Sequence, residues 1–462
     1  MIIAKSEIGN RKANAPRRSV LLLVVATVLL VALAAPAFAE PSPPPDFEGT
    51  HQLPSTATPP PRTRLLQYVD VAVLAAALTL AAVMAHVWRW RRGLLGLMLF
   101  SLVYFGFYRN GCICAIGAIQ NVALSVADGS GLPLPALAFL TLPIAFALVA
   151  GRVFCGAVCP LGAIQDLFIA LPLRVPRALE RALRVIPYVY LAAAVAMAAA
   201  AGVFLICQLD PFVGFFRLAG PLPMLLTGGA LLVLGMLVAR PYCRYLCPLG
   251  VVLGLASRLS IRPVTVTPKE CINCRLCEES CPFSAIHKPD LFKPAPPARA
   301  RKAALAAAIA AVLPLALAGA WLGGGLSMWA AQAHPIVRQA QQVHLAQEAP
   351  DADGDVAPGT AGGLQLACTV EERQAFEQTH RPAQELYVEA SAVTHRILWA
   401  CRLAGAFVGL VIGLKLVAAC VSRRRKEYVA DRAACLACGR CFDYCPVERA
   451  RRLGKIVELS AR

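Results

Sequence analysis

Eight cysteines fall in two short runs whose spacing suits metal chemistry. The first run, CINCRLCEESCP, begins at Cys271, and the second, CLACGRCFDYCP, begins at Cys435. Both follow C-x2-C-x2-C-x3-C-P, the spacing of bacterial [4Fe–4S] ferredoxins, in which thiolates on one tight loop bind the corners of a cluster. The pattern predicts two [4Fe–4S] clusters with the ligands Cys271, Cys274, Cys277, Cys281, Cys435, Cys438, Cys441 and Cys445.

Two other uses of these thiols fit the pattern less well. A structural zinc site favours two separated cysteine pairs around one tetrahedral ion, whereas each run packs three cysteines closely and adds a fourth before a proline. A disulfide framework needs an oxidising compartment, and the topology predicted below places both runs in the cytoplasm. The iron–sulfur interpretation is therefore preferred.

The two runs are separated by two apolar segments and by the stretch 332–396. Because two membrane spans return the chain to the side it left, the runs can dock as the halves of one split ferredoxin. In two-cluster ferredoxins the fourth cysteine of each run ligates the other cluster. By this hypothesis Cys281 joins Cys435, Cys438 and Cys441, and Cys445 joins Cys271, Cys274 and Cys277.

Four further cysteines form a repeated pattern at the ends of apolar segments. The stretches GRVFCGAVCPLG and RPYCRYLCPLG share C-x3-C-P-L-G. Four thiolates from two repeated elements suffice for a third cluster, another metal or a redox-active dithiol, although cysteine also packs well as a small apolar residue. This candidate redox or metal site comprises Cys155, Cys159, Cys243 and Cys247. A degenerate copy, CICAIGAIQ, adds Cys112 and Cys114 on the opposite face.

The elements that must position these cysteines are membrane helices. Hydrophobic residues make up 58% of the 462 residues and charged residues only 16%, which is typical of a polytopic membrane protein. Seven apolar segments approach the ~20 residues that a helix needs to cross a bilayer, and the second of them is short. They are Gln67–Trp88, Gly93–Phe107, Leu134–Ala150, Val185–Ile206, Leu222–Ala239, Ala303–Ala331 and Ile397–Cys420.

The basic residues predict which side each connection faces. If all seven segments cross, the connections on one side carry 35 of the 45 Lys and Arg residues and those on the other side carry eight. By the positive-inside rule the richer side is the cytoplasm, and it holds both ferredoxin runs. The net charge of +18 is thus mainly a topology signal with an attraction to membrane lipid, and no nucleic-acid partner is expected.

These signals predict an all-α polytopic membrane bundle in the bacterial inner membrane, with a small cytoplasmic ferredoxin-like [4Fe–4S] module. A basic start, an apolar middle and Ala37-Phe38-Ala39 are typical of a secretory signal. The expected order is a signal peptide or anchor (1–39), an exterior Pro-rich linker (40–66), the membrane core with the C-x3-C-P repeats (67–256), the first ferredoxin run (257–302), a transmembrane helix (303–331), an exterior loop (332–396), another transmembrane helix (397–420) and the second ferredoxin run (421–462).

The combination of C-x3-C-P repeats with two ferredoxin runs resembles the membrane polyferredoxins of the NapH-like and NosR-like type. The likeness covers about Gly93 to Ile286 and Cys435 to Leu453. It implies electron transfer between the quinone pool or a cytoplasmic donor and a redox partner outside. NosR-like proteins also carry an exterior flavin-binding domain, which has no counterpart in the 65 residues of 332–396. Any covalent flavin must therefore belong to a partner.

Two functions follow from this resemblance. In the first, the protein is a membrane-bound electron carrier, a component of an oxidoreductase system rather than a stand-alone enzyme. Quinol or a cytoplasmic donor would supply electrons to an exterior flavoprotein or metalloenzyme, with quinone as a candidate cofactor. In the second, the clusters sense redox state or support the assembly of a periplasmic metalloenzyme.

Overall fold

The computed structural model describes residues 63–111, 115–129, 131–170, 172–173, 175–266, 271–272, 274–289, 298–348, 382–421, 425 and 427–452. Within these ranges the chain is predominantly helical, with one two-stranded sheet. The predicted signal segment, nearly all of the Pro-rich linker, and Cys112 and Cys114 lie outside the described residues.

Among the residues that the structure describes, four helical stretches are long and apolar enough to cross a bilayer. They correspond to four of the predicted spans: α2 (Arg64–His86), α7 (Arg177–Leu183) with α8 (Ile186–Ala201), α15 (Ala298–Ala310) with α16 (Val312–Gln332), and α19 (Ala383–Cys420). The apolar helices α5 (Leu134–Ala150) and α11 (Leu222–Leu237) have 17 and 16 residues, so at 1.5 Å per residue they are about 25 Å long, less than a ~30 Å hydrocarbon layer. The short predicted segment 93–107 lies in α3 (Arg91–Ser101) and the π-helical η2 (Leu102–Tyr108).

A bundle core surrounds the C-x3-C-P repeats. The helices α2, α3, α5, α8, α4 (Ala115–Asp128), α6 (Pro160–Leu167) and α13 (Pro248–Arg258) enclose a buried apolar cluster that includes Leu78, Val158 and Leu253. Short elements connect them: η3 (Phe154–Val158), α9 (Leu205–Leu209), α10 (Val213–Arg217) and α12 (Pro241–Tyr245). Cys159 and Cys247 belong to the same buried cluster, so the repeats are part of the core rather than of a surface loop.

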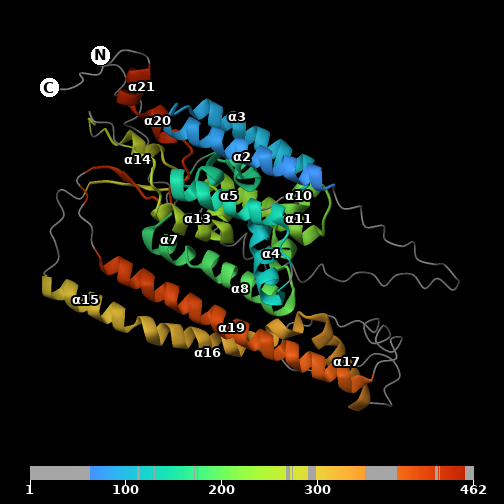
Figure 1. Cartoon of the computed structure of the whole chain (residues 1–462). Coiled ribbons are helices and arrows are strands. Elements are labelled where there is room, and N and C mark those ends of the chain that lie inside the picture. The colour runs from blue at the N-terminus through green and yellow to red at the C-terminus, as the bar shows by residue number, and fades with distance from the viewer. Residues whose placement is uncertain are drawn as a thin grey trace.

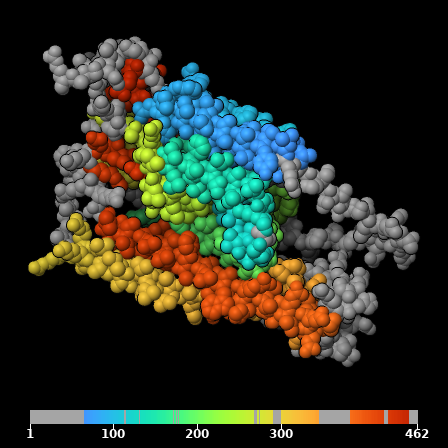
Figure 2. Space-filling model, viewed as in Figure 1, coloured from blue at the N-terminus to red at the C-terminus, as the bar shows by residue number. Residues whose placement is uncertain are grey.

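The helices α16 and α19 form an antiparallel hairpin along one side of this core (Figures 1 and 2). Glycines allow the two backbones to touch: a Cβ atom on Gly405 would lie 2.1 Å from the carbonyl oxygen of Gly319, and one on Gly323 would lie 2.1 Å from that of Cys401. Small residues four apart are the usual means by which membrane helices approach closely. The hairpin contacts the core mainly through α19 and α8.

The two ferredoxin runs meet at one end of the bundle (Figure 1). Strand β1 (Ile286–His287) follows the first run, and it pairs antiparallel with β2 (Val429–Ala430), which precedes the second. The short helices α14 (Leu276–Ser280) and α20 (Arg440–Tyr444) also contact each other, and α21 (Pro446–Arg452) follows. The opposite end of the hairpin carries α17 (Pro335–Glu348), within the stretch predicted as an exterior loop (Figure 1).

Candidate iron–sulfur centres

The first candidate centre is a small cavity between the two ferredoxin runs. Its sulfur-bearing residues are Cys281, Cys435, Cys438 and Cys441, three from the second run and one from the first. Apolar side chains close the cavity, among them Val266, Phe283 and Leu436. The four cysteines named together in the split-ferredoxin hypothesis therefore share one cavity.

The second candidate centre is the counterpart of the first. Cys271, Cys274 and Cys277 line a cavity together with Cys445, and Pro446, Val447 and Tyr428 complete the wall. Each run thus sends its fourth cysteine to the cavity of the other run. This exchange follows the ligand pattern of a two-cluster ferredoxin.

The local backbone conformation explains how the fourth cysteine of each run reaches the cavity of the other run. In both runs the residue after the second cysteine adopts a left-handed conformation, Arg275 with φ 64° and Gly439 with φ 73°. This turn starts the five-residue helices α14 and α20, each of which ends at the fourth cysteine in an extended conformation before a proline. The helix carries the fourth cysteine away from the other three, so it can line the neighbouring cavity.

Asp431, which precedes the second ferredoxin run, contacts residues that follow the first run. Its backbone N–H donates to the carbonyl of Ala285 at 2.7 Å, and its carboxylate lies 3.5 Å from Nε2 of His287. Although burial opposes ionisation, the interactions with His287 and the N–H of Ala433 lower the pKa of Asp431 to about 2. The docked module therefore carries an ionised carboxylate between β1 and β2 at neutral pH.

Burial favours the neutral form of several thiols in these cavities in the absence of metal. It raises the pKa of Cys277 to about 11 and that of Cys435 to about 12, and neighbouring thiols add to the effect in both cases. Iron binds the thiolate form of cysteine, so cluster binding would release the protons of these thiols. Within the described residues no group of three His, Cys, Asp or Glu side chains is placed to hold a single ion. In a [4Fe–4S] cluster each cysteine binds a different iron, so its sulfurs need not converge that closely.

The four cysteines of the C-x3-C-P repeats gather at a third place, the four-thiol site. Cys155 lies in the π-helical turn η3 and Cys159 just after it, while Cys243 lies in α12 and Cys247 just after that. Electrostatic coupling joins Cys247 to the other three thiols, and burial with these neighbours raises the pKa of Cys247 well above its usual value. Cys243 Sγ also accepts a hydrogen bond of 3.3 Å from Gln165 Nε2.

Two buried arginines flank the four-thiol site, and the sequence reasoning missed both. Arg152 and Arg240 are 8% and 1% exposed, and each stands three residues before the first cysteine of its repeat. Arg240 binds Asp166 through Nε at 2.7 Å and Nη2 at 2.8 Å, and it donates to the carbonyl of Cys155. The repeated unit is therefore R-x2-C-x3-C-P-L-G.

Arg152 has different partners from Arg240. It donates to the carbonyl of Ala433 at 2.8 Å and to Cys155 Sγ at 3.6 Å. Among the described residues none of the ion pairs places a carboxylate on Arg152. Burial alone would lower the pKa of Arg152, but thiolate charge on Cys155, Cys247 and Cys243 raises it. Negative charge on the four-thiol site would therefore stabilise this buried guanidinium.

The glycine of each repeat makes room for the arginine of the other. A Cβ atom on Gly162 would lie 2.9 Å from Nη1 of Arg240, and one on Gly250 would lie 3.2 Å from Nη2 of Arg152. The repeats therefore interlock as a pair related by approximate symmetry. This contact explains why the third residue after the second cysteine is glycine in both copies.

The four-thiol site packs directly on the first cavity. Gly156 lies against the backbone of Leu436, and Cys155 belongs to the same apolar cluster as Cys281, Cys435 and Cys438. Three groups of four cysteines therefore follow one another from the ferredoxin module into the bundle core.

Comparison with known proteins agrees with this geometry. Residues 132–177 and 220–264 match one family model described as a 4Fe-4S binding domain, and residues 264–287 match a second with the same description. The first two segments contain the C-x3-C-P repeats, and the third contains the first ferredoxin run. No solved structure matches the chain.

Several curated proteins are similar to the chain. Protein NirI of Paracoccus denitrificans is 35% identical over 219 residues, which cover 43% of this chain and 31% of NirI. Regulatory protein NosR of Pseudomonas aeruginosa is 32% identical over 213 residues, or 42% of this chain and 29% of NosR. An uncharacterized protein of Methanocaldococcus jannaschii, MJ0750, is 30% identical over 192 residues, which cover 39% of this chain and 77% of MJ0750.

This chain belongs to the NosR-like membrane polyferredoxins. The polyferredoxin accordingly carries 4Fe-4S binding domains and is related to NirI and NosR. Its matched segment spans less than a third of the length of either relative.

Proposed function

We propose that this polyferredoxin carries electrons between quinol or a cytoplasmic donor and a redox partner on the exterior face of the membrane. The observation that carries the proposal is the succession of three four-cysteine groups. The module of Cys271 to Cys281 and Cys435 to Cys445 would exchange electrons with the donor, and the four-thiol site would connect that module to the bundle core.

The donor sets fit [4Fe–4S] clusters, which would supply one-electron carriers when bound. The residues around them have separate tasks. Val266, Ile286 and Tyr428 pack beside the cysteines and exclude water, which tunes the reduction potential of such a centre. The crossed fourth cysteines tie the two halves of the module into one unit.

Arg152 supports a third cluster at the four-thiol site. An unpaired buried charge is strongly unfavourable, so a guanidinium without a carboxylate partner implies negative charge on its neighbours. Four neutral thiols would leave Arg152 uncompensated, whereas a cluster held by Cys155, Cys159, Cys243 and Cys247 would compensate it. The family model that covers both repeats is likewise described as 4Fe-4S binding.

The proposed sidedness follows from charge. The ferredoxin runs share their end of the bundle with most of the basic connections, which the positive-inside rule assigns to the cytoplasm. The four-thiol site lies at the same end, and a hydrocarbon layer ~30 Å thick separates it from the exterior. A further carrier must cover that distance, and quinone is the carrier we propose.

Iron content decides between the proposed sets of clusters. Anaerobically purified protein should hold about twelve irons and equal sulfide per chain, with three sets of EPR signals on stepwise reduction. About eight irons would restrict the clusters to the ferredoxin module and leave the four-thiol site as a dithiol or another metal site. Little iron under strict anaerobiosis would overturn the electron-transfer proposal as a whole.

A second candidate function is supported by the relatives named regulatory protein NosR. In that function, reduction of the clusters would change the affinity for a partner rather than sustain electron flow. Repeated turnover with a quinol analogue distinguishes the two. An electron carrier is expected to be reoxidised and reduced through many cycles, whereas a sensor is expected to respond to a single reduction.

A further inference from the structure

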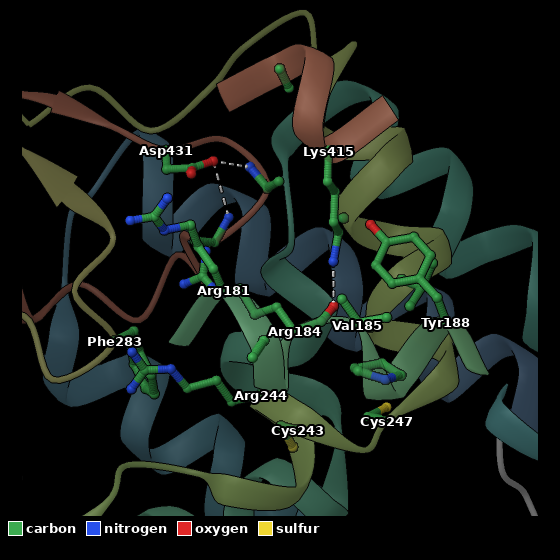
Figure 3. Close-up of a pocket in the computed structure, with 18 of the residues that line it drawn as sticks. Arg181, Arg184, Val185, Tyr188, Cys243, Arg244, Cys247, Phe283, Lys415 and Asp431 are labelled. Carbon is green, nitrogen blue, oxygen red and sulfur yellow. Dashed lines mark hydrogen bonds between the residues drawn. The ribbon is translucent and has the colours of Figure 1, made fainter. Parts of the chain in front are cut away.

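A cavity of about 870 Å³ lies between the bundle core and the hairpin, next to the four-thiol site. Its walls come from α7, α8, α12, α13 and α19 and from the chain before Cys435 (Figure 3). Cys243 and Cys247 form part of the wall. The proposed path through the three four-cysteine groups makes no use of this space.

The lining carries far more positive than negative charge. Its carboxylate is Asp431, and its cations are Arg152, Arg181, Arg184, Arg240, Arg244, Arg258 and Lys415. Asp166 offsets the charge of Arg240, and Glu180, bound to both Arg184 and Arg244, offsets one further charge. With Arg152, which contacts the four-thiol site, and Arg181 left out of the count, the cations Arg184, Arg244, Arg258 and Lys415 still outnumber the carboxylates of Glu180 and Asp431. This excess of positive charge favours an anionic occupant.

Arg244 also offers an unused hydrogen-bond donor. Its side chain is 7% exposed, and its Nε and Nη2 atoms bind Glu180 at 2.9 Å and 2.8 Å. Its Nη1 atom is buried without a hydrogen-bond partner. A buried donor that lacks an acceptor is unfavourable, so a small turn of this guanidinium toward an acceptor oxygen in the cavity would stabilise the wall.

Lys415 adds a cation within a membrane-spanning helix. Its Nζ atom donates to the carbonyl of Arg184 and lies 4.4 Å from the centroid of the Tyr188 ring (Figure 3). Ionisable residues inside spanning segments commonly mark binding sites or pathways. Here Lys415 stands where the basic part of the cavity meets an apolar part, which is lined by Val185, Ile412 and Leu416.

We propose that this cavity binds the phosphate headgroup of an anionic membrane lipid. Arginine forks suit phosphate oxygens, and basic pockets between spanning helices on the cytoplasmic side are typical lipid-headgroup sites. The acyl chains would lie along Val185 and Leu416, between α8 and α19. Such a lipid would fill the space beside Cys243 and Cys247 and shield them from water. The proposal goes beyond electron transfer and does not depend on it.

The test uses the full-length protein in a neutral detergent. Phosphatidylglycerol is expected to raise the thermal unfolding midpoint by about 5 °C at concentrations where phosphatidylcholine has no effect. Native mass spectrometry should show the same lipid retained. An equal effect of phosphatidylcholine overturns the proposal, as does a larger effect of a short-chain quinone. A full effect of inorganic phosphate alone would show a free-phosphate site and overturn the role of the lipid.

Variants locate the binding. The double variant Arg244→Gln, Lys415→Gln should bind phosphatidylglycerol about tenfold more weakly or worse, because it removes two cations. Arg402→Gln is the matched control, since Arg402 lies on the same helix but packs on Gly324 and Trp399. If the double variant fails to fold, the single variant Arg258→Gln, at the exposed rim of the cavity, is tested in its place. Its affinity for phosphatidylglycerol should fall by a smaller factor. Unchanged affinity in a folded variant overturns the site. Iron content of the same samples reports separately on the electron-transfer proposal.

Discussion

Gly156 of the first C-x3-C-P repeat lies against the backbone of Leu436 in the second ferredoxin run, and a Cβ atom on Gly156 would be 2.1 Å from the Leu436 carbonyl oxygen. Real contacts of this kind do not fall below 3.0 Å, so only glycine fits. The contact fixes the ferredoxin module on the bundle core. It also sets how closely the four-thiol site approaches Cys435 and Cys438.

Gly156→Ala should therefore loosen the module. Overpacking of a close contact typically costs 1–3 kcal/mol, so we expect a destabilisation of about 2 kcal/mol and faster loss of iron from the cavity of Cys435. Thermal unfolding and EPR would measure the two effects. Gly229→Ala is the control, because nothing lies within 4 Å of a Cβ at Gly229. If both variants behaved alike, the contact with Leu436 would have no structural importance.

Exchanging single cysteines tests the crossed ligands. Cys281→Ser alters the first run, but it should mainly damage the cluster of the second run, because Cys281 lines the cavity of Cys435, Cys438 and Cys441. Cys445→Ser should damage the cluster of the first run in the same way. EPR of each variant with iron analysis gives the result. Damage confined to the run that carries the substitution would refute the crossing.

The sequence was sufficient to predict the cysteine groups but not what surrounds them. Ligand spacing is a local property, so the pattern C-x2-C-x2-C-x3-C-P indicated the eight candidate ligands, while the crossed sets that line each cavity followed from the ligand exchange of two-cluster ferredoxins. Arg152 and Arg240 were counted only as topology charges, although their equal distance from Cys155 and Cys243 was already visible in the repeats. The basic cavity could not be predicted, because it depends on how α19 packs against α8, and 181 residues of chain lie between these two helices.

The Arg240–Asp166 pair provides a test that combines stability with pH. Asp166→Asn leaves the guanidinium of Arg240 buried without its carboxylate, and breaking a buried pair in this way costs about 3–5 kcal/mol. The neighbouring residue Gln165 cannot serve as the control position, because its side chain donates a hydrogen bond to Cys243 Sγ. Arg184→Gln is a better one, since Arg184 is more exposed and its partner Glu180 keeps Arg244. A lower unfolding midpoint in Asp166→Asn than in Arg184→Gln is expected.

The pH dependence of that difference follows from the pKa of Asp166. Burial opposes its ionisation, but the charge and hydrogen bonds of Arg240 lower the pKa below its usual value. A carboxyl with a lowered pKa in the folded state stabilises fully above its unfolded pKa and progressively less as pH falls through the folded one. The gap in midpoint between wild type and Asp166→Asn should therefore be constant near neutral pH and shrink below about pH 4.

Arg152 allows the charge of the four-thiol site to be measured directly. If a cluster occupies the site, Arg152→Gln removes a cation that contacts Cys155 Sγ. The reduced form then becomes less stable, and the midpoint potential of one EPR signal should fall. Arg152→Lys should restore part of the potential, because it keeps the charge but not both hydrogen bonds. The signals of the ferredoxin module should move less, since the hydrogen bond of Arg152 to a cysteine sulfur goes to Cys155 and its hydrogen bond to the module goes to the backbone carbonyl of Ala433. If no EPR signal changes its midpoint potential in a folded Arg152→Gln variant, the four-thiol site holds thiols without a redox-active metal.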